Sequence, residues 1–231
     1  MPQTRVVEIA CGPASFGVNA YLLLGRRPVL VDTGVANCAD HILAALAREG
    51  YVPRDLALIV ITHGHLDHTG SVRELAARSG APVAVHSADA AHVRGGTSAP
   101  VKGATRVGRL MANLVKHQDE AGAVTDASVE PSIMLSGGES LEGFGVDGHI
   151  LYTPGHTDGS VSVVLDDGPA LVGDLVRGKL LSRSTPAPSV FAVDPEEMLA
   201  SIRNVIAYAP HTVYASHSAP FGLEQMRAAF A

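Results

Sequence analysis

Short apolar segments separated by turn residues make up the first sixty positions of the chain. Residues 4–10, 18–24 and 28–32 are rich in branched apolar side chains, a composition that predicts β-strands. Three residues that include a glycine separate the last two segments, as in a hairpin. Residues 57–62 are mainly apolar throughout, which is typical of a strand buried on both faces. The pattern predicts a sheet in the N-terminal half.

Helical spacing appears in three segments of the same half. Residues 38–49 and 71–80 place apolar side chains three and four positions apart, and Gly80 is a typical helix end. Residues 106–117 carry a third such stripe, whose simplest interpretation is packing against a core. A further strand is expected at 82–86.

The pattern starts again after the glycine pair at 137–138. The expected elements are strands at 146–153, 160–165, 169–173 and 212–215, a helix from Pro195 to about Tyr208, and a closing helix. Asp194 is a good capping residue before a proline and two acids, which together indicate a helix start. Strands that alternate with helices predict an α/β fold, and the length suits a single domain over residues 1–231.

Composition narrows the class of partner. The chain has 231 residues, of which 46% are hydrophobic and 17% charged, with a formal net charge of -6. Such a balance is typical of a compact globular protein. The negative charge argues against nucleic acid or an anionic membrane as the main partner, so we expect a small-molecule substrate. The oligomeric state cannot be read from these features.

The N-terminal residues and the two cysteines bear on the compartment. No long apolar run of a signal peptide opens the chain, and no stretch of eighteen uncharged apolar residues occurs, so a cytoplasmic location is expected. Cys11 and Cys38 have no metal-site or redox-motif spacing. Both are interpreted as free thiols.

The sequence THGHLDHTG, at residues 62–70, concentrates side chains that bind metals. His63 and His65 share one side of an extended segment because side chains alternate there. Asp67 and His68 follow as the chain turns toward the helix expected from Ser71. Two groups of ligands therefore face two adjacent points in space. The cluster predicts a metal site directly after a buried strand.

Further candidate ligands follow other strands of the second half. His156 lies after the strand that ends near Thr153, Asp174 after the strand 169–173, and His217 after the strand 212–215. Loops at the carboxyl ends of strands can converge on one rim of a sheet. The sequence therefore predicts five histidines and two aspartates around one site.

These motifs make the chain resemble the metallo-β-lactamase superfamily of metallohydrolases. The resemblance covers nearly the whole chain, from VDTG at 31–34 through the histidine motif to TPGHTDGS at 153–160 and the last histidine. It implies an αβ/βα sandwich, in which two mixed sheets lie face to face with flanking helices. Ser216 and Ser218 stand where the family usually has glycine, which weakens the match around the last histidine.

The resemblance also implies roles for individual residues. His63, His65 and His156 correspond to ligands of one metal, and Asp67, His68 and His217 to ligands of a second. Asp174 corresponds to the carboxylate that bridges both metals, and Asp32 to a buried residue that orients ligands. Two divalent ions are expected, with Zn²⁺ as the first choice and iron or manganese as alternatives.

Two metals that share a carboxylate indicate hydrolysis. A hydroxide bridging the metals would be the nucleophile at neutral pH, and Asp67 could orient it and pass a proton to the leaving group. We expect cleavage of an ester, thioester, lactone or related bond in a small molecule. The sequence does not identify that substrate.

Other branches of the family remain as alternatives. Glyoxalase II proteins carry a further helical domain, for which the fourteen residues after His217 are too few. Lactonases have a tyrosine shortly after the bridging aspartate, where this chain has Leu175 and Val176, and β-lactamases usually replace that aspartate, which is Asp174 here. The other hypotheses are a single-iron persulfide dioxygenase and a non-catalytic, metal-stabilised binding protein.

Substrate selection is assigned to residues 94–118 and 177–192, of which 94–105 and 177–192 are expected to be irregular. The second follows Asp174 and is rich in glycine, serine and proline, as site-covering loops often are. Arg177 and Arg183, with Lys179, could bind a carboxylate of the substrate. Phe191 could form an apolar wall, together with Leu110 and Met111 of the first stretch.

Overall fold

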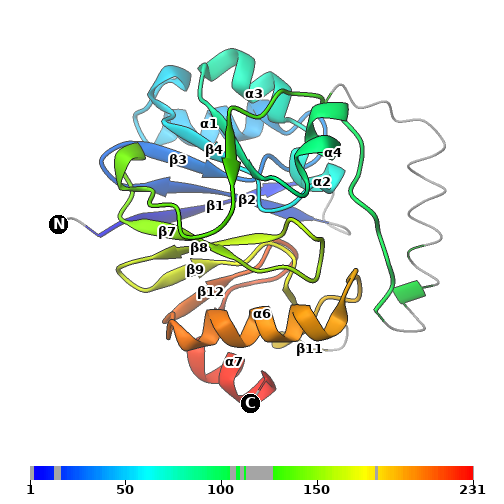
Figure 1. The fold of residues 1–231 in the computed structure, drawn as a ribbon. Helices are drawn as coiled ribbons and strands as arrows, with labels where there is room; N and C mark the ends of the chain where they lie inside the picture. The colour runs from blue at the N-terminus through cyan, green and yellow to red at the C-terminus, as the bar shows by residue number, and fades with distance from the viewer. Residues whose placement is uncertain are drawn as a thin grey trace.

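Two β-sheets lie face to face in the centre of the molecule, with helices on both outer sides (Figure 1). Residues 3–12, 17–104, 108–109, 112, 127–179 and 182–230 are described by this computed structural model. The arrangement has the four layers of an αβ/βα sandwich, as the sequence predicts.

The first sheet has six strands in the order of the sequence. They are β1 (Arg5–Cys11), β2 (Val18–Leu24), β3 (Pro28–Val31), β4 (Leu58–Val60), β5 (Val83–His86) and β6 (Ile133–Leu135). The first three pair antiparallel, whereas β3 to β6 pair parallel. The helices of this half are α1 (Ala39–Arg48), α2 (Leu66–Thr69), α3 (Val72–Ser79) and α4 (Ala90–Gly95), with a 3-10 turn at Pro53–Asp55.

The second sheet has five strands in the order β13-β12-β9-β8-β7. Their bounds are β7 (Gly148–Tyr152), β8 (Val161–Leu165), β9 (Pro169–Leu171), β12 (Thr212–Tyr214) and β13 (Phe221–Gly222). Only the pair β12 and β9 is parallel, so this sheet is also mixed. Helices α6 (Pro195–Ala207) and α7 (Leu223–Phe230) cover its outer side, and a 3-10 turn at Glu142–Phe144 precedes β7 (Figure 1).

The two sheets separate three apolar layers, because neighbouring side chains along a strand point to opposite faces of its sheet. In β2, Leu22 packs with α1 and α3, whereas its neighbour Leu23 packs between the sheets. In β8, Val163 packs between the sheets, whereas Val164 packs with α6 and α7. Because strand side chains alternate, strands that are apolar at every position can be covered on both faces. This explains the continuous apolar run that predicts β4.

Most elements agree with the sequence pattern, but the stretch 177–192 does not. It contains β10 (Val176–Lys179) and β11 (Ser182–Pro188), which pair antiparallel as a separate two-stranded sheet. The expectation of an irregular loop was therefore wrong. Prolines are tolerated in such edge strands because their missing N–H need not pair. Most of the helix expected at 106–117 lies outside the described residues, and the assignment of 1–231 as one domain stays a prediction.

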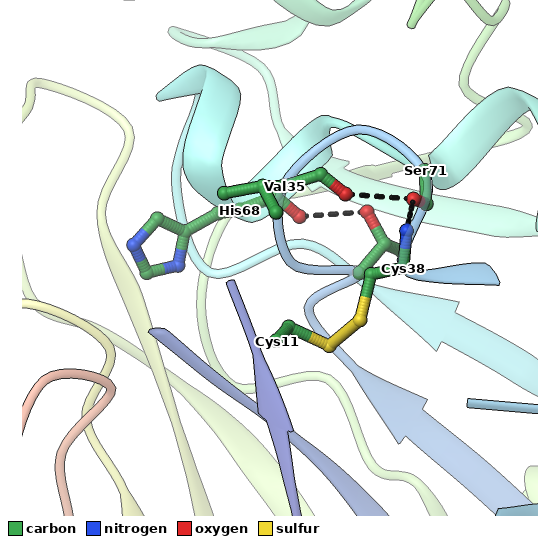
Figure 2. Close-up of a disulfide and its surroundings, with 6 residues drawn as sticks. Cys11, Val35, Cys38, His68 and Ser71 are labelled. Carbon is green, nitrogen blue, oxygen red and sulfur yellow. Dashed lines mark hydrogen bonds between the residues drawn. A yellow bond between two sulfur atoms is a disulfide. The ribbon is translucent and has the colours of Figure 1, made fainter. Parts of the chain in front are cut away.

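The expectation of two free thiols was also wrong, because Cys11 and Cys38 form a disulfide (Figure 2). It joins the end of β1 to the residue before α1, whose Cα atoms lie 5.7 Å apart. Gly34 lies against it, so that a Cβ at Gly34 would overlap the side chain of Cys11. Disulfides are typical of oxidising compartments, and the cytoplasmic location stays a prediction.

Hydrogen bonds also connect the segment before α1 to Ser71, the residue directly before α3. The Ser71 hydroxyl donates to the Val35 carbonyl and accepts from the Cys38 backbone N–H, each at 2.8 Å (Figure 2). The disulfide and Ser71 thus fix residues 33–38, which follow β3. Within the described part of the chain, no helix is long and apolar enough to cross a membrane.

Candidate metal centre

The predicted ligands meet at one rim of the sandwich. They lie in the loop after β4 and in α2 of the first half, and in loops that follow β7, β9 and β12 in the second. Strands of both sheets end at this rim, which is why residues far apart in the sequence come together there. Their ligand atoms form two groups of three, and a third combination that contains Asp174 shares one histidine with each of them.

The first group consists of three histidines. The Nε2 atoms of His63 and His156 each lie 3.1 Å from Nδ1 of His65. The three side chains are buried, with residue exposures between 1% and 6%. The group is held inside the rim rather than on its surface.

The second group consists of Asp67, His68 and His217. Nε2 of His217 lies 3.3 Å from Oδ2 of Asp67, and Nε2 of His68 lies 3.8 Å from the same oxygen. The His68 side chain is fully buried, but those of Asp67 and His217 are 41% and 29% exposed. This group therefore opens toward solvent.

Asp174 lies between the two groups. Its Oδ2 is 3.7 Å from Nε2 of His156 and 3.3 Å from Nε2 of His217, and its Oδ1 is 3.4 Å from Nε2 of His68. One carboxylate thus faces ligands of both groups. This is the position that a bridging ligand requires.

Asp32 fixes the ring orientation of two histidines from beneath the site. Its Oδ2 accepts from Nδ1 of His68 at 2.8 Å and from the Thr62 hydroxyl at 2.8 Å. Because the Thr62 hydroxyl proton is used there, its oxygen accepts from Nδ1 of His63 at 3.0 Å. Both imidazoles then carry a proton on Nδ1, so Nε2 is the nitrogen available to a metal.

The backbone at Asp32 is unusual. Its φ of 60° lies in the left-handed region, which costs free energy for a residue other than glycine. The residue is completely buried, and its Oδ1 also accepts the Thr62 backbone N–H at 2.8 Å. The hydrogen bonds to His68 and Thr62 explain why an aspartate occupies this position.

Backbone carbonyls orient two other histidines. Nδ1 of His156 donates to the Phe191 carbonyl at 2.9 Å, and Nδ1 of His217 donates to the Gly17 carbonyl at 3.0 Å. A carbonyl can only accept, so Nδ1 carries a proton in both rings and Nε2 is the nitrogen that faces the site. The Tyr21 hydroxyl also donates to the Ala215 carbonyl at 3.0 Å, close to His217.

Burial and charge give the two groups opposite proton affinities. Burial lowers the pKa of His63, His65 and His156, and brings the pKa of His65 to about 3. Burial also opposes the charged form of His217, but Asp174 and Asp67 outweigh it and raise its pKa to about 10. Near neutral pH, without metal, the first group is therefore neutral.

The second group carries charge of both signs under the same conditions. Burial lowers the proton affinity of His68, but Asp32, Asp67 and Asp174 outweigh it and raise its pKa well above the usual value. Burial alone would raise the pKa of Asp174, but His217 and His68 hold it well below its usual value. Ionised carboxylates and imidazoles thus stabilise each other there.

The contacts of the donor set fit metal ions. Two unprotonated nitrogens, on His63 and His156, both point at Nδ1 of His65, and one proton there could serve only one of them. Nε2 of His68 and Oδ1 of Asp174 are buried without a hydrogen-bond partner. Buried polar atoms normally have partners, and imidazole with carboxylate suits divalent ions such as zinc.

The residues expected to bind substrate have different surroundings. Arg177 is half-buried in β10. The side chain of Arg183 lies outside the described residues, as do Leu110 and Met111. Phe191 is half-buried, and its carbonyl contacts His156. Their substrate contacts stay a prediction.

Sequence reasoning missed several residues that support the ligands. Thr62 is the first residue of the histidine motif and directly precedes His63, so its position could have drawn attention to it. The carbonyls of Gly17 and Phe191 act through backbone atoms, and no side-chain pattern reveals them. Asp89 accepts the backbone N–H of Gly64 at 2.7 Å. It follows the expected strand 82–86, but nothing in the sequence connects it to the candidate ligands.

Comparison with known proteins agrees with the fold. The family model of the metallo-beta-lactamase superfamily matches residues 15–217. A relative from Bacillus subtilis strain 168, named probable metallo-hydrolase YflN, is 26% identical over 252 aligned positions, covering 95% of this chain and 90% of the relative.

Solved structures are similar over nearly the whole chain. The BLEG-1 B3 metallo-beta-lactamase matches with a TM-score of 0.72 and 22% identity, covering 98% of each chain. The protein TTHA1623, solved in a di-iron-bound form, matches with a TM-score of 0.68 and 25% identity, covering 96% of each chain. The chain belongs to the metallo-beta-lactamase superfamily and is a metal-dependent hydrolase of that family.

Proposed function

We propose that the protein is a dinuclear-metal hydrolase that cleaves an ester, thioester, lactone or related bond in a small molecule. The observation that supports this most strongly is the pair of ligand groups on either side of Asp174. A second support is the set of hydrogen bonds at Nδ1 of four histidines, which leaves Nε2 as the nitrogen available to a metal on His63, His68, His156 and His217.

In this proposal His63, His65 and His156 would hold one ion and Asp67, His68 and His217 the other. Asp174 would be a ligand to both, and Asp32 orients His68 directly and His63 through Thr62. We expect zinc, because three imidazoles are a common donor set for it. Iron and manganese accept similar ligands, and the similar protein TTHA1623 was solved with iron.

Ions held in this way supply two things: they polarise a carbonyl oxygen, and they bring the pKa of water down toward about 7. Proton transfer then depends on side chains of the protein. Asp67 has the most exposed side chain of the three residues in the second group. Although burial would raise its pKa, His68 and His217 lower it, so the carboxylate stays ionised at neutral pH.

An ionised Asp67 can accept the proton of the attacking water. It can then return this proton to the alkoxide, thiolate or amide nitrogen that leaves. Proton transfer by a positioned side chain typically contributes about 10²–10⁴-fold to a rate. The buried first group is too enclosed for this role, and its histidines are neutral.

The proposal is tested by substrate panels before and after chelation. Protein purified without added metal is assayed on p-nitrophenyl esters, acyl thioesters, simple lactones and a β-lactam, and assayed again after dialysis against a chelator and after addition of zinc. We expect turnover of at least one class, its loss on chelation and its return with zinc. Turnover that survives complete removal of metal would contradict the proposal.

A parallel measurement separates hydrolysis from oxygen chemistry. Oxygen uptake with glutathione persulfide is followed on protein loaded with iron and on protein loaded with zinc. We expect no uptake above the rate of the protein-free control. Stoichiometric uptake with iron and no hydrolysis of any substrate class would favour the dioxygenase alternative instead.

A further inference from the structure

Asp89 lies directly before α4, where an aspartate side chain would ordinarily cap the helix. It makes no capping hydrogen bond to α4. The residue is only 2% exposed, so its carboxylate is buried. Burying an ionised carboxylate costs free energy unless it accepts hydrogen bonds, and Asp89 accepts them from outside its own helix.

Three donors contact this carboxylate. Oδ2 accepts from the backbone N–H of Gly64 at 2.7 Å and from the hydroxyl of Thr157 at 2.7 Å. Oδ1 accepts from the backbone N–H of Gly159 at 3.1 Å. Ser160 completes the arrangement, because its hydroxyl lies 2.9 Å from that of Thr157 and accepts the Thr157 backbone N–H at 3.0 Å.

The donors belong to the two loops that carry the first group. Gly64 lies between His63 and His65, in the loop after β4 of the first sheet. Thr157 follows His156 directly, in the loop between β7 and β8 of the second sheet. One carboxylate thus connects the two sheets at the point where the three imidazole nitrogens meet.

Both glycines permit this close contact. A Cβ at Gly159 would lie 2.6 Å from Oδ1 of Asp89, which is closer than atoms can approach. A Cβ at Gly64 would lie 3.3 Å from the Cβ of Asp89, also tighter than usual. Asp89 therefore contacts the loop backbones directly, without an intervening side chain.

We propose that Asp89 is a positioning residue for the first group, which sets the distance between the His63–His65 loop and the His156 loop. The inference rests on the proposed function, because it assigns Asp89 a role in holding the ligands of one ion. It predicts that loss of the carboxylate weakens metal binding at the first group far more than at the second.

The main test is Asp89→Asn. The amide has nearly the same size, but its NH₂ group cannot accept, so at least one of the three donors loses its partner. We expect zinc affinity at the first group to fall about 10–100-fold, the range for residues that orient metal ligands. Competition with a chromophoric chelator measures the affinities. Imidazole ¹⁵N spectra show whether zinc reaches the first group or the second, where His68 and His217 report it.

A second readout needs no metal. In metal-free protein, hydrogen exchange at the amide of Gly64 or Gly159, or at both, should be at least tenfold faster in Asp89→Asn than in the wild type. The two amides donate to different oxygens of the carboxylate, and the asparagine side chain keeps only one accepting oxygen. Thr157→Val, which removes only the hydroxyl donor, should give a smaller loss of zinc affinity. It also serves as the test variant if Asp89→Asn does not fold.

Asp194→Ala is the matched control for general destabilisation. Asp194 caps α6 by accepting from the backbone N–H groups of Glu196 and Glu197, so its loss also removes two hydrogen bonds between a carboxylate and the backbone. We expect this control to keep wild-type zinc affinity at both groups.

Three outcomes would overturn the inference. They are zinc affinity at the first group within twofold of wild type in Asp89→Asn and Thr157→Val, an equal fall in Asp194→Ala, and unchanged exchange at Gly64 and Gly159. A wild-type protein that binds no zinc at all would instead refute the proposed function. The exchange measurement on metal-free protein would then still decide whether Asp89 holds the loops together.

Discussion

The two ligand groups differ in burial and in charge. The first consists of neutral histidines that are almost fully buried, whereas the second pairs imidazoles with carboxylates and exposes Asp67 and His217. Removing neutral imidazole from water costs little compared with removing a charge. The buried half can therefore be rigid and dry, and the half that faces solvent can carry the charges used in proton transfer.

The largest effect should come from breaking the link between the groups. Asp174→Ala removes the carboxylate that faces both, so we expect loss of one or both ions and a fall in kcat of about 10²–10³-fold or more. Elemental analysis and steady-state kinetics on the identified substrate measure this. Near-native turnover with full metal content would show that Asp174 does not bridge.

The disulfide is the next largest contribution. Cys11 and Cys38 are 27 positions apart, and closing a loop of that size stabilises a protein by about 3–4 kcal/mol. The double variant Cys11→Ala, Cys38→Ala should lose a comparable free energy of unfolding, measured by urea denaturation of the metal-free protein. A loss below about 1 kcal/mol would contradict this estimate of the stabilisation from loop closure.

The disulfide should also affect the two groups unequally. It fixes residues 33–38, and Thr33 contacts the second group, because its hydroxyl and its backbone N–H both donate to the His68 carbonyl at 2.8 Å. The double cysteine variant should therefore weaken zinc binding at His68 more than at His65. Equal weakening of zinc binding at His68 and His65 would contradict the connection between the disulfide and the second group.

A smaller effect is expected at the exposed end of the second group. His217→Ala removes one candidate ligand but leaves the first group and its supports intact. We therefore expect the first ion to stay bound while affinity for the second falls by more than the roughly 10–100-fold that is lost with a residue that only orients a ligand. Stepwise zinc titration distinguishes the two. Loss of both ions in this variant would mean that the groups do not bind metal separately.

The smallest expected effect is the number of protons that are released when zinc binds. At pH 8 the lowered pKa values leave the first group unprotonated, whereas the raised pKa of His217, about 10, and the raised pKa of His68 leave these two protonated without metal. Zinc must displace those protons, so only the second binding step should release them and strengthen as pH rises. Calorimetric titration in buffers of different ionisation enthalpy measures the release.

The seven candidate ligands could be located from the sequence because they belong to segments that follow strands and carry their chemistry in their side chains. Their supports could not. The carbonyl that orients His217 belongs to Gly17, 200 positions away, and any residue could supply it. Asp89 resembles a helix cap in sequence, and only the approach of two loops from different sheets explains its burial.

Two other features depended on tertiary structure. The cysteines show no motif spacing, and only the approach of β1 to the start of α1 brings them within bonding distance. The prolines Pro186 and Pro188 argue against a strand, yet β11 pairs only with β10 along this stretch, so each proline can direct its nitrogen away from the partner. Local propensity could not reveal either arrangement.

The most direct test of the central claim is the number of ions that each chain binds. Metal-free protein is titrated with zinc and examined by native mass spectrometry, with His217→Ala titrated in parallel. We predict that the wild type fills in two steps to two ions per chain, and that the variant stops at one over the concentration range that saturates the wild type. A wild-type protein that stops at one ion with excess zinc would contradict the account.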